Sequence, residues 1–225
     1  VDIPDFTASM VGDIKNVKIG LVKEFFEAPL DAEVHTVIKA AIAQLESLGA
    51  EIIEVSMPMF EQAQAISGTI LMAEAAAYHR DLLKEHADKL YPPVRLRIES
   101  GLFVTAADYL KAQQGRGLFN KAMSDLFLEV DALGGPSQPI TAPPLLANTV
   151  EINGETVGTT AALTQYSRPY NISGTPAISI PCGFSKSGMP IGLQIAGKAY
   201  DEAMVLRIAK VYQDSTTWHQ KRPIV

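Results

Sequence analysis

Hydrophobic positions in the first 60 residues alternate between strand-like runs and helix-like spacing. Residues 17–22 (VKIGLV) form a short apolar run that predicts a buried strand. Apolar residues then recur every three or four positions: Val34, Ile38, Ala41, Leu45 and Leu48. This spacing predicts one face of a helix that Asp31 caps and Gly49 ends. Residues 52–55 predict a second strand, so the order indicates a βαβ unit with a parallel pair of strands.

The middle of the chain has a helical pattern. Residues 60–90 are rich in Ala, Leu and Glu and predict helical structure, which the Pro pair at 92–93 interrupts. Thr105, with an acidic residue three positions later, resembles a capping box and predicts another helix running to about residue 127. A short apolar segment at 130–133 predicts a strand that ends in a loop at Gly134-Gly135-Pro136.

The remaining pattern indicates antiparallel strands and one more helix. Asn153-Gly154 lies between two strand-like segments and predicts a tight hairpin. Residues 177–184 and 191–196 read as paired strands joined by a turn. Asp201 is placed to cap a last helix whose apolar stripe is Val205, Ile208, Ala209 and Tyr212. The chain is therefore expected to be an α/β protein.

Composition excludes several classes of protein. The chain has 225 residues, of which 47% are hydrophobic and 20% are charged, as in an ordinary globular protein. A net charge of −6 argues against a nucleic-acid partner or an anionic membrane partner. The sequence has no run long enough to span a bilayer, and it does not open with the layout of a signal peptide. Cys182 is the single cysteine, which excludes an internal disulfide framework and suits a reducing cytoplasm.

Spacing alone identifies no complete catalytic site. The glycine pattern of a phosphate-binding loop is absent, and the four histidines lack metal-binding spacing, so we predict no cofactor and no metal. Cys182 could be a nucleophile, but its apolar neighbours favour a buried structural role. The serines lie outside any G-x-S-x-G motif. We therefore assign no catalytic residue from spacing.

Several segments together resemble the C-terminal region of the amidase signature family. The main match is YNISGTPAISIPCGF at 170–184, followed by GMPIGLQIAG at 188–197. Further matching segments occur in the same order as in the family: 17–22, LGAEIIEV at 48–55, AADYLKAQ at 106–113 with Arg116, and Asp201-Glu-Ala. The likeness covers nearly the whole chain.

The resemblance implies an amide hydrolase with a mixed sheet sandwiched between layers of helices. The family uses a Ser nucleophile, a second Ser and a Lys base, with a Gly/Ser-rich loop as oxyanion hole. All of these belong to the N-terminal half of the family's domain. This sequence has no Gly-Gly-Ser-Ser-type segment, so the chain is expected to be the C-terminal part of such an enzyme, inactive alone. Residues 1–16 then read as a linker, and residues 17–225 as the C-terminal part of the domain.

The resemblance also suggests three substrate-binding positions. Tyr78 and Arg97 correspond to positions that contact the acyl side in glutamine-using members of the family. Thr164 falls where those members have an Asp, and this change removes the partner of a substrate amino group. We therefore expect a general amidase acting on a small-molecule amide, rather than the A component of a glutamyl-tRNA amidotransferase. For Arg97 a surface ion pair, and for Tyr78 plain packing, stay open as alternatives.

Two other functions stay open beside this one. The first is a non-catalytic binding or scaffold module that retains the fold. The second is an unrelated ligand-binding α/β domain, which would be favoured if strands 177–184 and 191–196 lay outside one common sheet. If the chain is a C-terminal part, its strand edges and apolar surface should associate with the N-terminal half or form a homo-oligomer.

Overall fold

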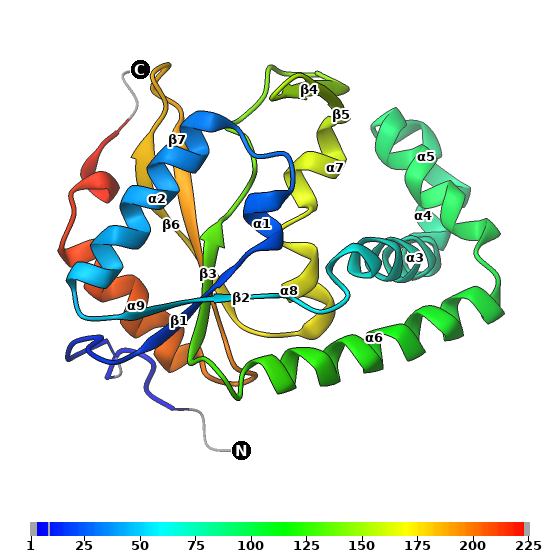
Figure 1. Ribbon diagram of the computed structural model, residues 1–225. Coiled ribbons are helices and arrows are strands. Elements are labelled where there is room, and N and C mark those ends of the chain that lie inside the picture. Colours follow the sequence, from blue (N-terminus) through cyan, green and yellow to red (C-terminus); the bar gives the residue numbers. More distant parts are fainter. Residues whose placement is uncertain (1–3, 9, 223–225) are drawn as a thin grey trace.

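A five-stranded sheet with strands in both directions lies at the centre of the molecule (Figure 1). The computed structural model describes residues 4–8 and 10–222. In spatial order the strands are β2 (Glu51–Val55), β1 (Lys18–Val22), β3 (Ala132–Pro136), β7 (Pro190–Gly197) and β6 (Ala177–Phe184). β1 pairs in parallel with β2 and β3, whereas β7 is antiparallel to β3 and β6. The expected mixed sheet is confirmed, and the strands predicted at 177–184 and 191–196 share it.

Helices surround this sheet, and a small separate hairpin lies beside it. The helices are α1 (Glu24–Glu27), α2 (Ala32–Ser47), α3 (Phe60–Tyr78), α4 (Arg80–His86), α5 (Pro92–Ser100), α6 (Ala106–Leu126), α7 (Thr159–Thr164), α8 (Arg168–Ser173) and α9 (Glu202–Asp214). Short 3₁₀ turns are η1 (Ala87–Lys89), η2 (Gly101–Phe103) and η3 (Trp218–Gln220). The hairpin consists of β4 (Thr149–Ile152) and β5 (Glu155–Gly158).

The predicted βαβ unit is present, with its helix bounded as expected. The Asp31 carboxylate accepts hydrogen bonds from the backbone N–H groups of Glu33 and Val34, which satisfies the first turn of α2. Gly49 has φ +100°, a left-handed conformation that ends the helix at little steric cost. β1 and β2 then pair in parallel on either side of this crossover. The boundary expected between residues 16 and 17 stays a prediction, and Ile14 before it is buried in the core.

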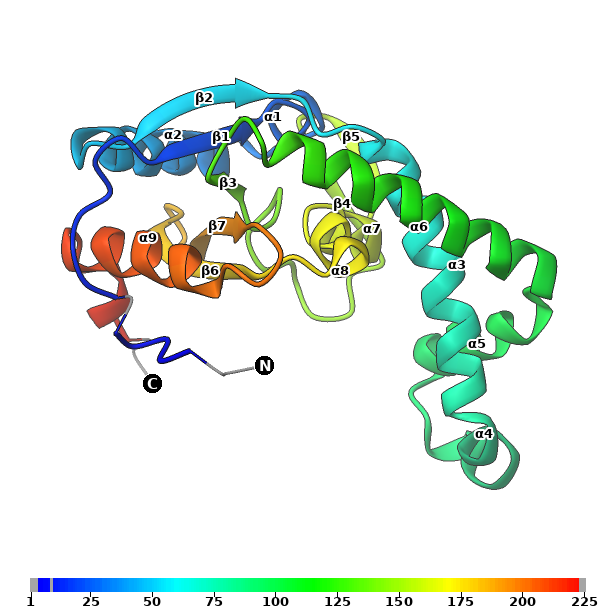
Figure 2. The ribbon, with the colours of Figure 1, turned by 90° about the horizontal axis from the view of Figure 1, so that it is seen from below.

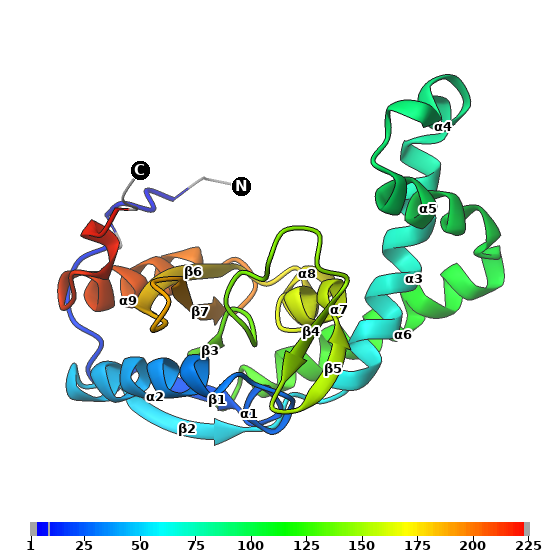
Figure 3. The same cartoon turned by 90° about the horizontal axis from the view of Figure 1, so that it is seen from above.

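Helices α2 and α9 cover one face of the sheet. Val37 of α2 fills the space beside Gly183 of β6, and Val205 of α9 fills the space beside Gly197 of β7. Gly183 pairs with Ile191, which lies an even number of residues from Gly197 and therefore points to the same face. Figures 2 and 3 show α2 and α9 at the same end of the molecule.

The opposite face is covered at β3 and open at β6. Phe25 of α1 lies against Gly135 of β3, and its ring stacks on Tyr166 with 4.5 Å between centroids. Tyr170 of α8 meets the same ring edge-on at 6.4 Å. Gly135 and Ser179 both pair with Gln194, so they share this face, yet Ser179 is exposed.

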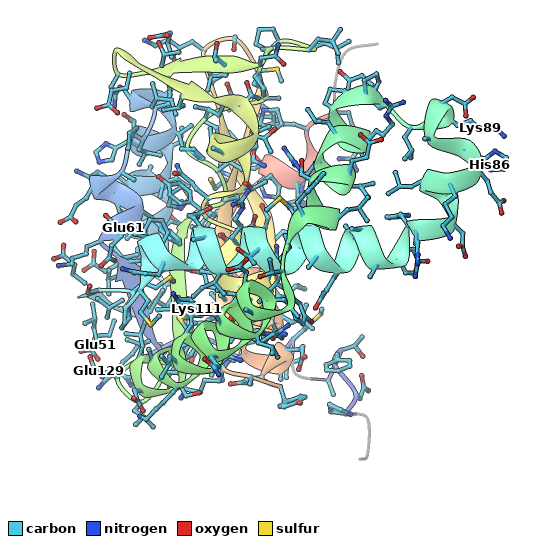
Figure 4. The ribbon with its side chains drawn as sticks, turned by 90° about the vertical axis from the view of Figure 1, so that its right-hand side faces the viewer. Glu51, Glu61, His86, Lys89, Lys111 and Glu129 are labelled. Atoms are coloured by element: carbon cyan, nitrogen blue, oxygen red, sulfur yellow. The ribbon has the colours of Figure 1, made fainter. Side chains whose placement is uncertain are left out.

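A helical arm, residues 60–126, projects away from the sheet (Figure 2). In the chain it follows β2 and precedes β3. α3 and α6 run side by side along it, with Ile66 of α3 against Gly115 of α6. Figure 4 shows His86 and Lys89 at the far end of the arm and Glu61 near the sheet. The arm therefore carries its middle helices away from the core.

The structure confirms one expectation for this region and corrects another. The helical structure expected over 60–90 is present as α3, α4 and η1, with an interruption at His79. The segment Gly134-Gly135-Pro136 belongs to β3 rather than to a loop. Its glycines are needed in the sheet, since a Cβ at Gly135 would lie 2.9 Å from the Phe25 ring. The predicted Asn153-Gly154 hairpin is present, with positive φ at both residues.

Within the described residues, no helix is both long enough and apolar enough to cross a membrane. The expected stripe of α9 is buried, and Asp201 caps the helix by accepting the backbone N–H of Met204. The base of the arm packs against the body of the molecule at α8, which both α3 and α6 contact.

Candidate functional site

A hollow of about 450 Å³ lies where the arm meets the body of the molecule. Its walls come from α3, α5 and α6 of the arm and from α7 and α8 of the body. We call it the arm cavity. Its charged lining residues are Arg97, Arg116, Arg168 and Glu74. Three cations against one anion make this cavity a candidate binding site.

Arg168 is the most firmly placed of the three arginines. It is the first residue of α8, and the next two residues, Pro169 and Tyr170, are buried and anchor the helix in the core. Arg168 is half-buried, and its Nη1 donates to the carbonyl oxygen of Gln64 at 3.4 Å. Loss of solvent, and secondly the positive charge of Arg97, lower the pKa of Arg168.

Arg116, on α6, also lines the arm cavity. Its Nε donates to the carbonyl oxygen of Ile172 at 2.8 Å, which satisfies an acceptor near the end of α8. Because this bond uses only Nε, the two terminal nitrogens keep donors to spare. The segment at 106–113 and Arg116 already stood out as a family match in the sequence, although not as a site.

Arg97 approaches the cavity from the arm. It lies on α5, is exposed, and has no carboxylate within ion-pair distance among residues 4–8 and 10–222. Its neighbour Arg95, on the same helix, pairs with Glu99 at 3.1 Å. The surface ion pair considered for Arg97 is therefore absent from the described part of the chain.

Other polar groups also line the arm cavity. The Glu74 carboxylate accepts the Tyr109 hydroxyl at 2.9 Å. The Thr164 hydroxyl donates to the carbonyl oxygen of Thr160 at 2.8 Å, one helical turn earlier. Ser67 is buried on α3 in the same wall. The cavity thus offers free donors from its arginines and one carboxylate, of which only Oε1 accepts a hydrogen bond within the described residues.

The structure brings together two of the three positions suggested by the sequence. Arg97 and Thr164 line one cavity although they are far apart in the chain. Tyr78 does not line it: its side chain is 85% exposed at the end of α3, where its ring meets the His79 ring edge-on. Arg168 was missed, because its position within YSRPYNIS carries no local signal of a binding role.

Cys182 has the buried structural role that its neighbours predict. Its side chain is only 4% exposed, and its Sγ donates to the carbonyl oxygen of Ile191 at 3.4 Å. Burial raises the pKa of the thiol to about 12. A nucleophilic thiolate is therefore disfavoured here. In the same described residues, no group of three His, Cys, Asp or Glu side chains could hold a metal ion.

A second hollow of about 400 Å³ lies on the uncovered part of the sheet. Ser137 and Ser179 line it, and their hydroxyl groups are hydrogen-bonded to each other, with 2.6 Å between the oxygens. A Cβ at Gly192 would collide with both hydroxyls, so the bare backbone of β7 forms the floor between them. We call the surface around Ser137, Ser179 and Gly192 the open face.

Comparisons with known proteins give a consistent result. A family profile described as Amidase matches residues 1–206. An amidase of Pseudomonas putida is 36% identical over 225 residues, which cover 98% of this chain and 47% of that protein. The A component of the glutamyl-tRNA(Gln) amidotransferase of Brevibacillus brevis is 34% identical over 250 residues, covering 99% of this chain and 49% of that protein.

Solved structures agree with the sequence relatives. A crystal structure of an amidase superposes with a TM-score of 0.84 at 30% identity, covering 91% of this chain and 46% of that one. The chain spans about half the length of the curated relatives it matches.

Proposed function

The chain belongs to the amidase family, and from this premise we propose that it is the C-terminal portion of an amide-hydrolysing enzyme. The observation that carries the proposal is a match over nearly all of this chain to proteins about twice as long. The sequence holds no Gly/Ser-rich segment in which a nucleophilic Ser and an oxyanion hole could form. In the proposal, the catalytic Ser-Ser-Lys group lies on an N-terminal half of the enzyme. This chain contributes part of the substrate pocket and of the hydrophobic core.

The open face is the surface that we assign to that N-terminal half. Ser179 is exposed in the middle of an eight-residue strand, and within the described residues the hydroxyls of Ser137 and Ser179 bond only to each other. A sheet face that carries small residues over bare backbone allows another chain to approach closely. β6 is also an edge strand, with unpaired backbone groups along its outer side.

In this arrangement the arm cavity receives the acyl part of the amide. Arg97 and Thr164 are the substrate-binding residues, and Tyr78 at the end of α3 contributes from the rim. Thr164 has no charge with which to hold a substrate ammonium group, so we assign the chain to the general amidases rather than to the glutamyl-tRNA amidotransferases. The single, buried Cys182 suits a reducing compartment, and we propose a cytoplasmic location.

The proposal is tested by restoring the missing half. The first half of the Pseudomonas putida amidase is fused to this chain, and hydrolysis of a chromogenic anilide is followed by absorbance. We expect turnover by the fusion and none by this chain alone. Turnover by this chain alone would show that it carries its own nucleophile and would contradict the proposal.

A matched pair of variants tests the assigned surface in the same fusion. Ser179→Arg places a long cation on the open face and should abolish turnover. Ser47→Arg makes the same change at the exposed end of α2, on the covered side, and should leave turnover unchanged. Equal activity of the two variants would remove the open face as the contact surface.

A further inference from the structure

We propose that Gln194 anchors the N-terminal half of the enzyme to this chain. Its buried side-chain amide pairs with the backbone N–H and C=O of one residue in an extended segment of that half, where the half rests on the open face. Gln194 is a positioning residue, which sets where the catalytic group lies relative to the arm cavity. The inference rests on the proposed function and deepens it, because it names the side chain that holds the two halves together.

Gln194 points to the side of the sheet that carries the open face. It lies in β7, an inner strand, and its Cα partners are Gly135 of β3 and Ser179 of β6. Residues that pair across neighbouring strands point to one side of a sheet, as do residues two apart in one strand. Two residues earlier, Gly192 faces the hydroxyls of Ser137 and Ser179, because a Cβ there would lie 2.7 Å and 2.6 Å from their oxygens. The Gln194 side chain therefore belongs to the face on which we place the N-terminal half.

The amide of Gln194 is out of water and without a partner. Only 8% of the residue's surface is exposed, and within residues 4–8 and 10–222 its Oε1 accepts no hydrogen bond. Its Nε2 donates to no group in that part of the chain. Thr159 and His219 also carry a buried polar atom without a partner, but neither residue is buried as a whole. Buried polar groups are almost always hydrogen-bonded in folded proteins, so this amide needs a partner from outside the described residues.

The surroundings of Gln194 indicate a neutral partner. The adjacent hollow of about 400 Å³ is lined by Ser, Gln, Ile, Ala, Pro and Gly, and none of these described residues is charged. A buried ion would therefore lack a counter-charge here. In an extended segment the N–H and C=O of one residue point to the same side. The Gln194 amide, with one acceptor oxygen and an N–H₂ donor, can bond to both of them.

The sheet beside Gln194 allows such a segment to approach. Gly192 has no side chain, and the flanking residues Ser137 and Ser179 are small and bond to each other at 2.6 Å. The relatives are about twice as long as this chain, and the half that it lacks supplies the segment in this proposal. The competing occupant is a second copy of this chain, because it would meet the same uncovered face.

Gln194 is connected to the arm cavity through the core. The Phe25 ring covers Gly135, the neighbour of Gln194, and meets Tyr170 of α8 edge-on at 6.4 Å. α8 also carries Arg168, which lines the arm cavity. A segment held by Gln194 is therefore held at a fixed place relative to a substrate in that cavity. Because reacting atoms must come within about 3–3.5 Å, loss of this hold should lower kcat more than it weakens substrate binding.

Thermal unfolding of one substitution in two proteins tests the pairing without catalysis. Gln194→Met keeps the length of the side chain and removes its hydrogen-bonding groups. In the purified chain it should raise the melting temperature by about 2–4 °C, because the amide there has no partner. In the fusion with the first half of the Pseudomonas putida amidase it should lower the melting temperature, because a satisfied hydrogen bond is lost. An equal change in both proteins, or no gain in the purified chain, would overturn the inference.

A matched control and the competing occupant have their own outcomes. Gln44→Met makes the same change on α2, at a half-buried position on the covered side of the sheet, and should shift neither melting temperature. If a second copy held the amide, Gln194→Met would destabilise the purified chain and lower its mass in light scattering. That result would overturn the assignment to the N-terminal half.

Anilide hydrolysis by the fusion tests the positioning role. Gln194→Met should lower kcat by about tenfold or more and change KM by less than about twofold, because the arm cavity is intact. Gln44→Met should change neither constant. A wild-type kcat in Gln194→Met, or an equal loss in both variants, would overturn the positioning role. Should the fusion carrying Gln194→Met fail to fold, the melting temperature of the purified chain still decides whether the amide lacks a partner.

The two proposals fail separately. Opposite shifts in melting temperature, with no anilide turnover by the unsubstituted fusion, would refute the amide-hydrolysing function and leave the pairing of the two halves in place. Turnover by the unsubstituted fusion that Gln194→Met leaves unchanged would refute the inference and leave the enzyme.

Discussion

Single side chains in the core set measurable chemical properties of this protein, and Cys182 is the plainest case. Its thiol pKa is raised from 9.0 to about 12 by burial. At pH 8 we expect the native protein to react with a disulfide reagent about a thousandfold more slowly than the chain unfolded in denaturant, because the thiolate fraction falls tenfold per pKa unit. Absorbance of the released thiol measures both rates. Fast reaction of the native protein would mean that β6 opens readily.

Two glycines of the arm should respond oppositely to the same substitution. A Cβ at Gly101 would lie 2.0 Å from the backbone oxygen of Met72, so Gly101→Ala should reduce the free energy of unfolding by about 1–3 kcal/mol. Gly117, inside α6, has no atom within 4 Å of such a Cβ. Gly117→Ala should raise the free energy of unfolding by about 0.5–1 kcal/mol.

Urea unfolding followed by circular dichroism measures both variants of the arm. Both variants replace Gly by Ala, so the effect of this change on the unfolded chain is the same and cancels when the two free energies of unfolding are compared. A neutral result for Gly101→Ala would show that η2 can move away from α3 without cost.

At the scale of elements, the cap of α2 can be tested against a neighbouring acidic residue. Asp31→Ala removes the acceptor of two backbone N–H groups and should lower the free energy of unfolding by about 1 kcal/mol. Glu46→Ala, on the exposed side of the last turn, removes an equal charge without a cap. Thermal unfolding of both variants compares them. Equal destabilisation would mean that charge, rather than capping, is what Asp31 provides.

Elements with local signals could be predicted from the sequence, whereas tertiary packing decided the rest. Asp31 and Gly49 bounded α2 correctly because capping and the left-handed turn are local chemistry. The glycines of β3 looked like a loop, but they stay in the sheet because Phe25 occupies the space that a side chain at Gly135 would need.

The candidate site could be predicted only in part, because tertiary packing brings its residues together. Arg97 and Thr164 were singled out by family likeness, and the structure places both on the arm cavity. Arg168 joins them only through the packing of α8 against the arm. Charges from α5, α6 and α8 converge in space without any shared spacing in the chain.

For the whole molecule, buried acids make stability fall in alkaline solution. Burial raises the pKa of Tyr166, Tyr170 and Tyr212 above the ordinary 10.0, and that of Cys182 above 9.0. Above pH 10 the unfolded chain therefore releases protons that the folded chain keeps, and the free energy of unfolding decreases as pH rises. Each such group contributes about 1.4 kcal/mol per pH unit.

Urea midpoints measured between pH 8 and pH 11 check this alkaline slope. Tyr170→Phe should flatten it, while Tyr200→Phe, at a residue 94% exposed, should not. A slope unaffected by Tyr170→Phe would contradict the burial of its hydroxyl.

The open face and the edge of β6 should also govern how the chain behaves in solution. We expect the isolated chain to associate with itself, and light scattering should give a mass above that of one 24.3 kDa chain. Ser179→Arg should shift the mass toward the monomer, whereas Ser47→Arg should not. A monodisperse wild-type monomer that binds little hydrophobic dye would contradict this expectation.

The arm also affects the entropy cost of assembling the sheet during folding. β3 pairs with β1, and the 76 residues from 56 to 131 separate β3 in the chain from β2, the other strand that pairs with β1. Since α3 and α6 lie side by side, with Ile66 against Gly115, folding of the arm brings the two ends of that segment together. The loop that β3 must then close is short, and its entropy cost falls accordingly. Folding of the projecting arm should therefore favour the pairing of β3 with β1.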